Sequence, residues 1–161
     1  MNQDNPLVSI ITVVYNGSRT LEQTIQSVIS QSYKNIEYII IDGGSTDGTL
    51  DVIKRHKDSV NFWITEPDKG LYDAMNKGIS YANGEIIGLI NSDDWYETNA
   101  VELVVEAYRN DGSKKIFHAD KRCVLPNGVS FVRKANRNNF LFKYHGMVLN
   151  HPTMFIHKEI Y

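Results

Sequence analysis

Three runs of almost unbroken hydrophobic residues dominate the chain. They cover Leu7–Val14, Ile36–Ile41 and Ile86–Ile90, and each is followed within two residues by Asn or Asp. Strands that are apolar on both faces are typical of a parallel sheet covered by helices, because neither face meets water. Val60–Thr65 is predicted to be a further strand.

Segments with a helical period alternate with these strands. Hydrophobic residues recur on one helical face in two segments: Leu21, Ile25, Val28 and Ile29, then Leu71, Met75, Ile79 and Ala82. Two further helices are expected over Thr49–His56 and Asn99–Tyr108, the second opening on a capping box formed by Asn99 and Glu102. Ser18 or Thr20 is placed to cap the first helix. This order predicts an α/β fold, a mostly parallel Rossmann-like sheet with helices on both faces.

The pattern changes after residue 112. Lys115–Asp120 is expected to form one strand, and Cys123–Leu125 and Val129–Arg133 flank the turn sequence Pro126-Asn127-Gly128 of a hairpin. The C-terminal portion is therefore predicted to be antiparallel. The remaining residues, 136–161, show weak periodicity and end without a terminating signal, so we expect a single domain over 1–161 that is truncated at its C-terminal end.

Composition and charge exclude several classes of protein. The chain has 161 residues, 42% hydrophobic and 22% charged, which is ordinary for one soluble globular domain. A net charge of −2 without a long Lys or Arg run argues against a nucleic-acid partner. One cysteine, Cys123, excludes an internal disulfide. Because no bilayer-length apolar run or signal peptide is visible, we expect a cytoplasmic protein.

An acidic pair follows the third hydrophobic run. Asn91-Ser92-Asp93-Asp94 begins where the strand Ile86–Ile90 ends, at the sheet edge where open α/β folds keep their ligand crevice. Adjacent carboxylates repel each other unless they are solvated or share a cation. The alternative is an exposed turn that caps the following helix.

Two loops at the same edge carry further candidates. Residues 42–49 form a glycine-rich loop that lacks both the P-loop lysine and the glycine spacing of dinucleotide-binding proteins. We interpret the Asp42 carboxylate as an acceptor for a ring N–H of a nucleobase, or else the loop only caps a helix. Val14, Tyr15 and Asn16 end the first strand and are candidates for a nucleoside platform, although a single Tyr more commonly packs in a core.

The segment 66–78 begins the third large helix. Asp73 and Lys77 suit an i, i+4 ion pair, which an ordinary amphipathic helix would also show. Gly78 in a helix costs about 1 kcal/mol relative to Ala, so we expect a close approach there. Lys69, Gly70 and Asn76 are candidates for contact with a diphosphate.

These segments, in this order, resemble family 2 glycosyltransferases of the GT-A fold. The resemblance rests on residues 6–16, 42–49, 68–78 and 91–95. It implies that Asp42 recognises the nucleoside and that 91–94 is a DxD-type motif for ribose and a divalent metal. Many relatives carry Asp at the position of Asn91, which moves the expected ligands for Mn²⁺ or Mg²⁺ to Asp93 and Asp94. Many carry Arg at the position of Met75, which leaves open how the diphosphate is held in that turn.

The resemblance also implies a reaction and its partners. It implies that a sugar is transferred with inversion from a nucleoside diphosphate, with UDP favoured over GDP or dTDP. The acceptor would be a glycan or a lipid-linked molecule, in the assembly of a surface polysaccharide or glycoconjugate. Such an acceptor would bring the protein to the inner face of the membrane. Residues 6–112 would form the nucleotide-binding half, and 113–161 would begin the acceptor-side half.

The catalytic base has no convincing match. In the resembling family it is a carboxylate downstream of the metal motif, so we expect it beyond Tyr161 and expect this chain to bind donor but transfer little. Within the chain the weaker candidates are Asp120, Glu159, His118, His145 and His151, with His151 first because residues 150–155 resemble an acceptor-side segment.

Two other functions stay open. A sugar-1-phosphate nucleotidyltransferase would need a glycine- and Arg/Lys-rich loop after the first strand, and residues 16–19 are poor in glycine and lysine. A binding module that holds a nucleotide sugar without catalysis would show neither transfer nor donor hydrolysis.

Overall fold

A six-stranded sheet forms the centre of the protein, in the order β3-β2-β1-β4-β8-β5. The computed structural model describes residues 5–135 and 150–161. The main strands are β1 (Val8–Val14), β2 (Ile36–Asp42), β3 (Phe62–Thr65), β4 (Ile86–Asn91), β5 (Ile116–Phe117) and β8 (Phe155–His157). The helices are α1 (Leu21–Ile29), α2 (Thr49–Arg55), α3 (Leu71–Tyr81) and α4 (Ala100–Asn110), with 3-10 turns η1 (Lys57–Ser59), η2 (His151–Thr153) and η3 (Lys158–Ile160).

The predicted parallel strands are confirmed. β1 pairs in parallel with β2 on one side and with β4 on the other, and β2 pairs in parallel with β3. β3 begins two residues later than expected, at Phe62. All seven residues of β1 are buried, as expected for a strand with helices over both faces.

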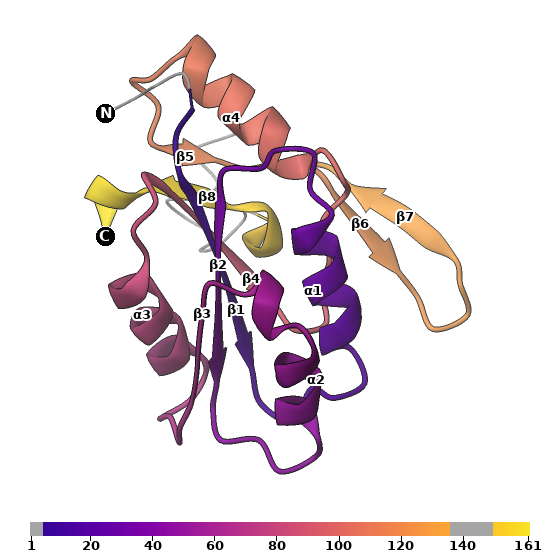
Figure 1. The fold of residues 1–161 in the computed structure, drawn as a ribbon. Helices are drawn as coiled ribbons and strands as arrows, with labels where there is room; N and C mark the ends of the chain where they lie inside the picture. Colours follow the sequence, from indigo (N-terminus) through magenta and orange to yellow (C-terminus); the bar gives the residue numbers. More distant parts are fainter. Residues whose placement is uncertain (1–4, 136–149) are drawn as a thin grey trace.

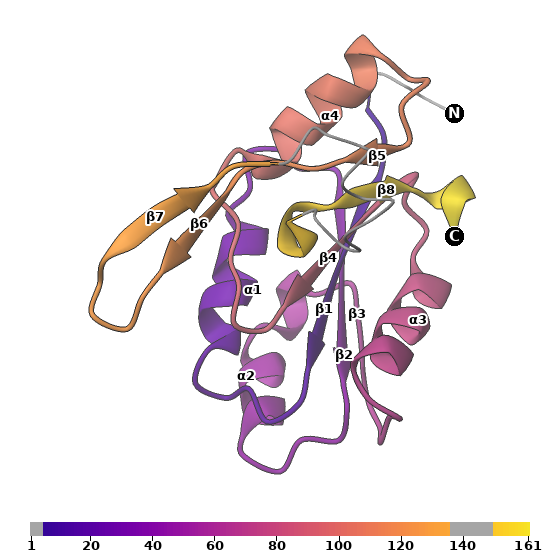
Figure 2. The same cartoon turned by 180° about the vertical axis from the view of Figure 1, so that it is seen from behind.

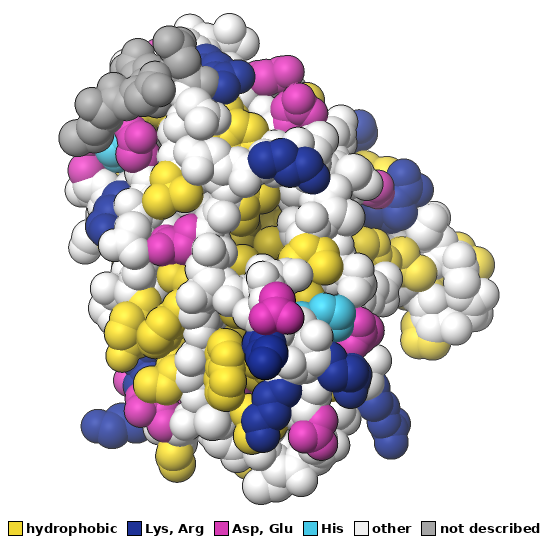
Figure 3. Space-filling model, viewed as in Figure 1, with side chains coloured by type: hydrophobic (Ala, Val, Ile, Leu, Met, Phe, Trp, Pro, Cys, Tyr) yellow, Lys and Arg dark blue, Asp and Glu magenta, His cyan; other side chains and the backbone are white. Residues whose placement is uncertain are grey.

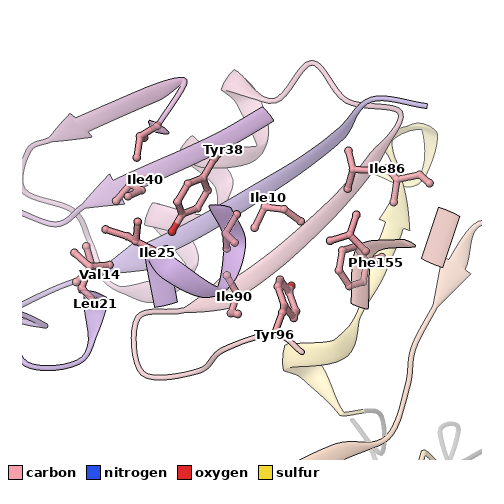
Figure 4. Packing of buried hydrophobic residues seen from close by; sticks show 14 of the residues in the cluster. Ile10, Val14, Leu21, Ile25, Tyr38, Ile40, Ile86, Ile90, Tyr96 and Phe155 are labelled. Carbon is pink, nitrogen blue, oxygen red and sulfur yellow. The ribbon is translucent and has the colours of Figure 1, made fainter. Parts of the chain in front are cut away.

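Helices cover both faces of the sheet, and each face has its own hydrophobic core. Figures 1 and 2 show α1 and α2 on one side of the sheet and α3 on the other. The first core joins α1, α2 and α4 to the sheet, and Figure 4 shows Tyr38, Ile10 and Ile25 within it. The second core packs Ala74 and Met75 of α3 against the other face.

Two predicted helix caps are wrong. Thr20 lies at the N-cap position of α1, but its hydroxyl contacts the Gly17 carbonyl oxygen at 3.5 Å instead of capping the helix. Asn99 lies at the N-cap of α4 without a side-chain cap, and the Glu102 carboxylate accepts a hydrogen bond from the Ser32 hydroxyl at 2.6 Å. A tertiary contact between α4 and the loop after α1 therefore replaces the local capping box that was predicted.

The C-terminal portion is antiparallel, as predicted, but its strands differ from the expected ones. β5 covers only Ile116–Phe117, because the backbone carbonyl of Ala119 accepts from the side chains of Asn150 and Thr153 rather than from a strand. β8 was not predicted, and it lies between β4 and β5, antiparallel to both. The Phe155 ring lies against Gly88, where a Cβ would come within 2.6 Å of it.

The predicted hairpin is confirmed, one or two residues displaced. It consists of β6 (Lys121–Val124) and β7 (Ser130–Arg133), which form a separate two-stranded sheet. Figures 1 and 3 show that it protrudes from the rest of the molecule. Among the described residues no helix is long and apolar enough to cross a membrane.

Candidate functional site

The carboxyl ends of the parallel strands meet at one edge of the sheet. Asp42 lies opposite both Val14 and Thr65, and Asn91 lies opposite Val13. The loops that follow β1, β2, β3 and β4 therefore leave the sheet side by side, which is where ligands bind in open α/β folds.

Hydrogen bonds join the β1–α1 loop to the β2–α2 loop. Asn16 has a left-handed backbone (φ 51°), a conformation that Asn tolerates better than most residues. Its N–H donates to the Ser45 hydroxyl at 2.7 Å, and its side-chain oxygen accepts from the Thr46 N–H at 2.9 Å. The Gly17 N–H donates to the Thr49 hydroxyl at 2.9 Å. These contacts fix the position from which Tyr15 extends.

The Asp47 carboxylate also joins these two loops through hydrogen bonds. It accepts from the Ser18 N–H at 3.0 Å and from the Thr49 hydroxyl at 2.5 Å. Hydrogen bonding from Thr49, reinforced by Ser18, lowers the pKa of Asp47 well below its usual range, because these donors stabilise the ionised carboxylate.

Helix α1 holds the β4–α4 loop that carries the acidic pair. The Thr24 hydroxyl donates to the Asp94 carbonyl oxygen at 2.8 Å, and the Tyr96 N–H donates to the Ser27 hydroxyl at 3.2 Å. The Gln31 side chain donates to the Glu97 carbonyl oxygen at 2.9 Å. α1 and the residue Gln31 that follows it thus position a loop whose own backbone hydrogen bonds include the turn from the Asp94 N–H to the Asn91 carbonyl oxygen at 3.2 Å.

A cavity of about 1410 Å³ opens between these loops. Seven of the ten residues predicted to bind a nucleotide sugar line it: Val14, Tyr15, Asn16, Gly70, Asn91, Ser92 and Asp93. Tyr15 is 66% exposed, so its ring is available to a ligand and is not part of the core. The Asn91 side-chain oxygen is buried and has no hydrogen-bond partner among the described residues.

Three predicted binding residues do not line this cavity. Asp42 has no exposed surface, and its carboxylate accepts hydrogen bonds from the Ser45 and Thr65 hydroxyls and from the Ser45 N–H. Its oxygens are therefore occupied by the protein, and the assignment of direct base recognition to Asp42 is corrected. Lys69 and Asn76 are exposed on the surface around α3 and lie outside the lining.

A second cavity of about 710 Å³ lies beside α4. Asp93 lines both cavities, whereas Asp94 lines only the second. No group of three or more His, Cys, Asp or Glu side chains suited to a metal occurs within residues 5–135 and 150–161. Mg²⁺ and Mn²⁺ need only one or two protein carboxylates when substrate phosphates complete the shell, so the exposed Asp93 carboxylate fits such an ion.

The residues predicted as candidates for the catalytic base do not lie together. His118 and Asp120 line the second cavity, and the His118 Nδ1 atom is buried without a partner among the described residues. Glu159 pairs with Lys115 at 3.1 Å, outside both cavities. His151 belongs to η2, but its side chain, like all of His145, lies outside the described residues.

Two acidic residues of the first cavity, Asp47 and Asp68, were not among the predicted binding residues. Asp68, in the β3–α3 loop, lines the cavity together with Gly43 and Pro67. Its place just before α3 is typical of an acidic residue that interacts favourably with the helix dipole. No local signal shows that residue 68 meets residue 43, because the contact depends on the pairing of β2 with β3.

Comparison with known proteins identifies the family to which the chain is similar. The model described as "Glycosyl transferase family 2" matches residues 9–158. An uncharacterized glycosyltransferase of Mycobacterium tuberculosis is 38% identical over 109 residues, 66% of this chain and 42% of that protein. A chondroitin synthase of Pasteurella multocida is 33% identical over 126 residues, 76% of this chain and 13% of that protein. The chain thus spans less than half the length of these relatives.

Solved structures share the architecture at low sequence identity. TarS 1–349 of S. aureus in complex with UDP-GlcNAc superposes with a TM-score of 0.71 and 18% identity, over 95% of this chain and 46% of that one. A mannosyltransferase of Pyrobaculum calidifontis in complex with GDP-Man and Mn²⁺ gives a TM-score of 0.63 and 21% identity, over 76% and 36% of the two chains.

Proposed function

Because the chain belongs to glycosyltransferase family 2 and has the GT-A fold that its motifs predict, we propose that it supplies the donor-binding part of a sugar-transferring enzyme. The reaction moves a sugar from a nucleoside diphosphate to an acceptor hydroxyl, with inversion, in the assembly of a polysaccharide or glycoconjugate. The observation that carries the proposal is the cavity shared by Tyr15, Asn91 and Asp93.

The cavity offers the groups that a nucleoside diphosphate needs. An exposed aromatic ring at Tyr15 provides a flat surface for a base, and the polar residues Asn91 and Ser92 line the cavity where a ribose would lie. Tyr15 lies in the loop that the Asn16 and Asp47 hydrogen bonds join to the β2–α2 loop, and Asn91 is the last residue of β4. A preorganised site of this kind loses little entropy on binding.

The acidic pair suits a divalent cation. Asp93, with Asp94 beside it, would hold Mn²⁺ or Mg²⁺, which when bound neutralises charge on the departing diphosphate. The chain's own contribution is to fix Asp93 at the mouth of both cavities through the contacts between α1 and the β4–α4 loop. The Mn²⁺ in the mannosyltransferase complex supports this assignment by analogy of fold alone.

The second cavity is the proposed acceptor side. It meets the donor cavity at Asp93, so an acceptor hydroxyl there would approach the donor sugar from across the metal-binding carboxylate. His118 and Asp120 lie along its wall and are positioned to contact an acceptor. The catalytic base and the identity of the acceptor are questions for the whole protein, because the matched part of this chain covers only 42% of the mycobacterial relative.

Calorimetric titration of UDP into this chain tests the donor and metal assignments. With Mn²⁺ present, we expect Asp93→Asn to weaken UDP binding about tenfold or more, because a charge-assisted metal ligand is lost. Binding measured in EDTA should be the same in the variant and the parent chain. Asp94→Asn should show a loss in the same direction.

The matched control is Asp58→Asn, which removes an exposed carboxylate of η1 outside both cavities. It should leave UDP affinity unchanged with and without Mn²⁺. Unchanged Mn²⁺-dependent affinity in both the Asp93 and Asp94 variants contradicts the metal assignment, and absence of UDP binding by the parent chain contradicts the proposed function.

A further inference from the structure

The carboxylate of Asp68 occupies the space in which a side chain at position 43 would lie. A Cβ placed on Gly43 would overlap Asp68 Oδ2 and lie 3.1 Å from Asp68 Cγ. Both residues line the donor cavity. The β3–α3 loop therefore delivers a negative charge to the end of β2, directly beside the buried Asp42.

Local contacts hold Asp68 in this position. Its Oδ1 accepts a hydrogen bond from the Gly70 N–H at 2.8 Å. The Glu66 N–H donates to the Asp42 carbonyl oxygen at 3.0 Å, which extends the pairing of β2 and β3 toward Asp68. Gly44 lies beside Pro67, since a Cβ built on Gly44 would be in ordinary contact with the Pro67 nitrogen at 3.4 Å. The Oδ2 atom is thereby presented beside Gly43 at the cavity wall.

The two neighbouring carboxylates differ in what they can still accept. Asp42 is fully buried and already receives hydrogen bonds from two hydroxyls and a backbone N–H. Asp68 is only partly buried and lines the cavity directly. A ligand in the cavity can therefore reach the Asp68 carboxylate but not that of Asp42.

We propose that Asp68 is the residue that selects the nucleobase of the donor. This rests on the proposed function of the cavity. Asp68 accepts a hydrogen bond from a ring N–H, so it favours uracil, thymine and guanine, which carry one beside a carbonyl group. It disfavours cytosine, whose pairing edge presents a bare ring nitrogen that would face the carboxylate lone pairs. A charged acceptor strengthens the favoured contact and an unpaired acceptor penalises the other.

Titration of UDP and CDP in parallel measures this selection, because the two ligands share the ribose and diphosphate. The parent chain with Mn²⁺ should bind UDP at least tenfold more tightly than CDP. Asp68→Ala should lose most of that ratio by weakening UDP, while CDP affinity stays within about twofold. The Asp58→Ala control should retain the ratio.

Moving the carboxylate from position 68 to position 43 tests whether Asp68 recognises the base or only supports the structure of the loops. Gly43 is absent from the glycines with positive φ among the described residues, so its backbone accepts a side chain once Asp68 is removed. The double variant Gly43→Asp/Asp68→Ala returns a carboxylate to the same space from the other loop. It should recover UDP preference over CDP relative to Asp68→Ala, which a merely structural role of Asp68 does not predict.

The outcomes distinguish the two proposals. If the parent chain binds neither nucleotide with Mn²⁺, the proposed function fails. If the parent chain prefers UDP and a folded Asp68→Ala variant keeps the full preference, only the assignment of Asp68 is overturned. Equal losses for UDP and CDP in Asp68→Ala also overturn it, because they indicate damage to the shared diphosphate site. Circular dichroism melting of each variant confirms that it is folded.

Discussion

At the scale of single residues, Asp42 and Asp68 show that proximity to a site does not decide a side chain's role. Asp42 stands at the carboxyl end of β2, as predicted, yet the hydroxyls of Ser45 and Thr65 saturate its oxygens. Thr65 belongs to another strand, so sequence around Asp42 could not reveal this contact. Asn91 and Asp93, in contrast, line the cavity at the end of β4, where the sequence places them, and their binding roles stay predictions.

Asp47 provides a pH-dependent test of the joined loops. Its pKa is lowered in the folded protein, so its ionised form stabilises folding fully above the unfolded value of about 3.9, and this contribution declines as the pH falls below that value. We expect Asp47→Asn to lower the free energy of unfolding at pH 7. Urea unfolding should show a smaller difference between variant and parent at pH 2.5.

A difference that stays constant between pH 7 and pH 2.5 would mean that the ionised carboxylate is not what joins the two loops. The hydrogen bonds to Ser18 and Thr49 would then contribute through the shape of the side chain alone.

At the scale of secondary-structure elements, prediction succeeded where a segment carries its own pattern. The apolar runs of β1, β2 and β4 and the hydrophobic stripes of α1 and α3 need no distant partner to be recognised. β8 was missed because its three residues form a strand only by pairing with β4, about 70 positions earlier. The capping box of α4 failed for the same reason, since a tertiary hydrogen bond from Ser32 to Glu102 replaced the expected local one.

Gly78 is a glycine inside helix α3, and close packing on the sheet explains its presence there. A Cβ at this position would overlap Ile11 Cγ2 and lie 3.3 Å from Ile41 Cγ1, so α3 approaches β1 and β2 as closely as glycine permits. The predicted close approach is thus confirmed, as packing of the helix on the sheet.

Gly78→Ala should lower the free energy of unfolding by up to about 2 kcal/mol. Overpacking costs typically 1–3 kcal/mol, and the higher helix propensity of Ala offsets about 1 kcal/mol of it. Urea denaturation monitored by circular dichroism measures the change. Asn76→Ala on the exposed side of the same helix is the control and should stay within about 0.5 kcal/mol. A stabilised Gly78→Ala variant would show that α3 can move away from the sheet without loss.

At the scale of the whole molecule, the strand order places the site. Because β1 lies between β2 and β4, the loops after all three strands converge, and the cavity draws its walls from segments up to about 80 residues apart. The α/β class and this edge of the sheet follow from sequence. The meeting of two cavities at Asp93 does not, since the second cavity depends on the placement of β5 and β6 beside α4.

The most direct test is a crystal structure of the chain grown with UDP and Mn²⁺. We expect electron density for the nucleotide between the loops after β1, β2 and β4, with the base beside Tyr15 and Asp68 and the ion between Asp93 and the diphosphate. A nucleotide bound on another face of the protein, or an ion held by residues remote from Asp93, would show that the donor site lies elsewhere.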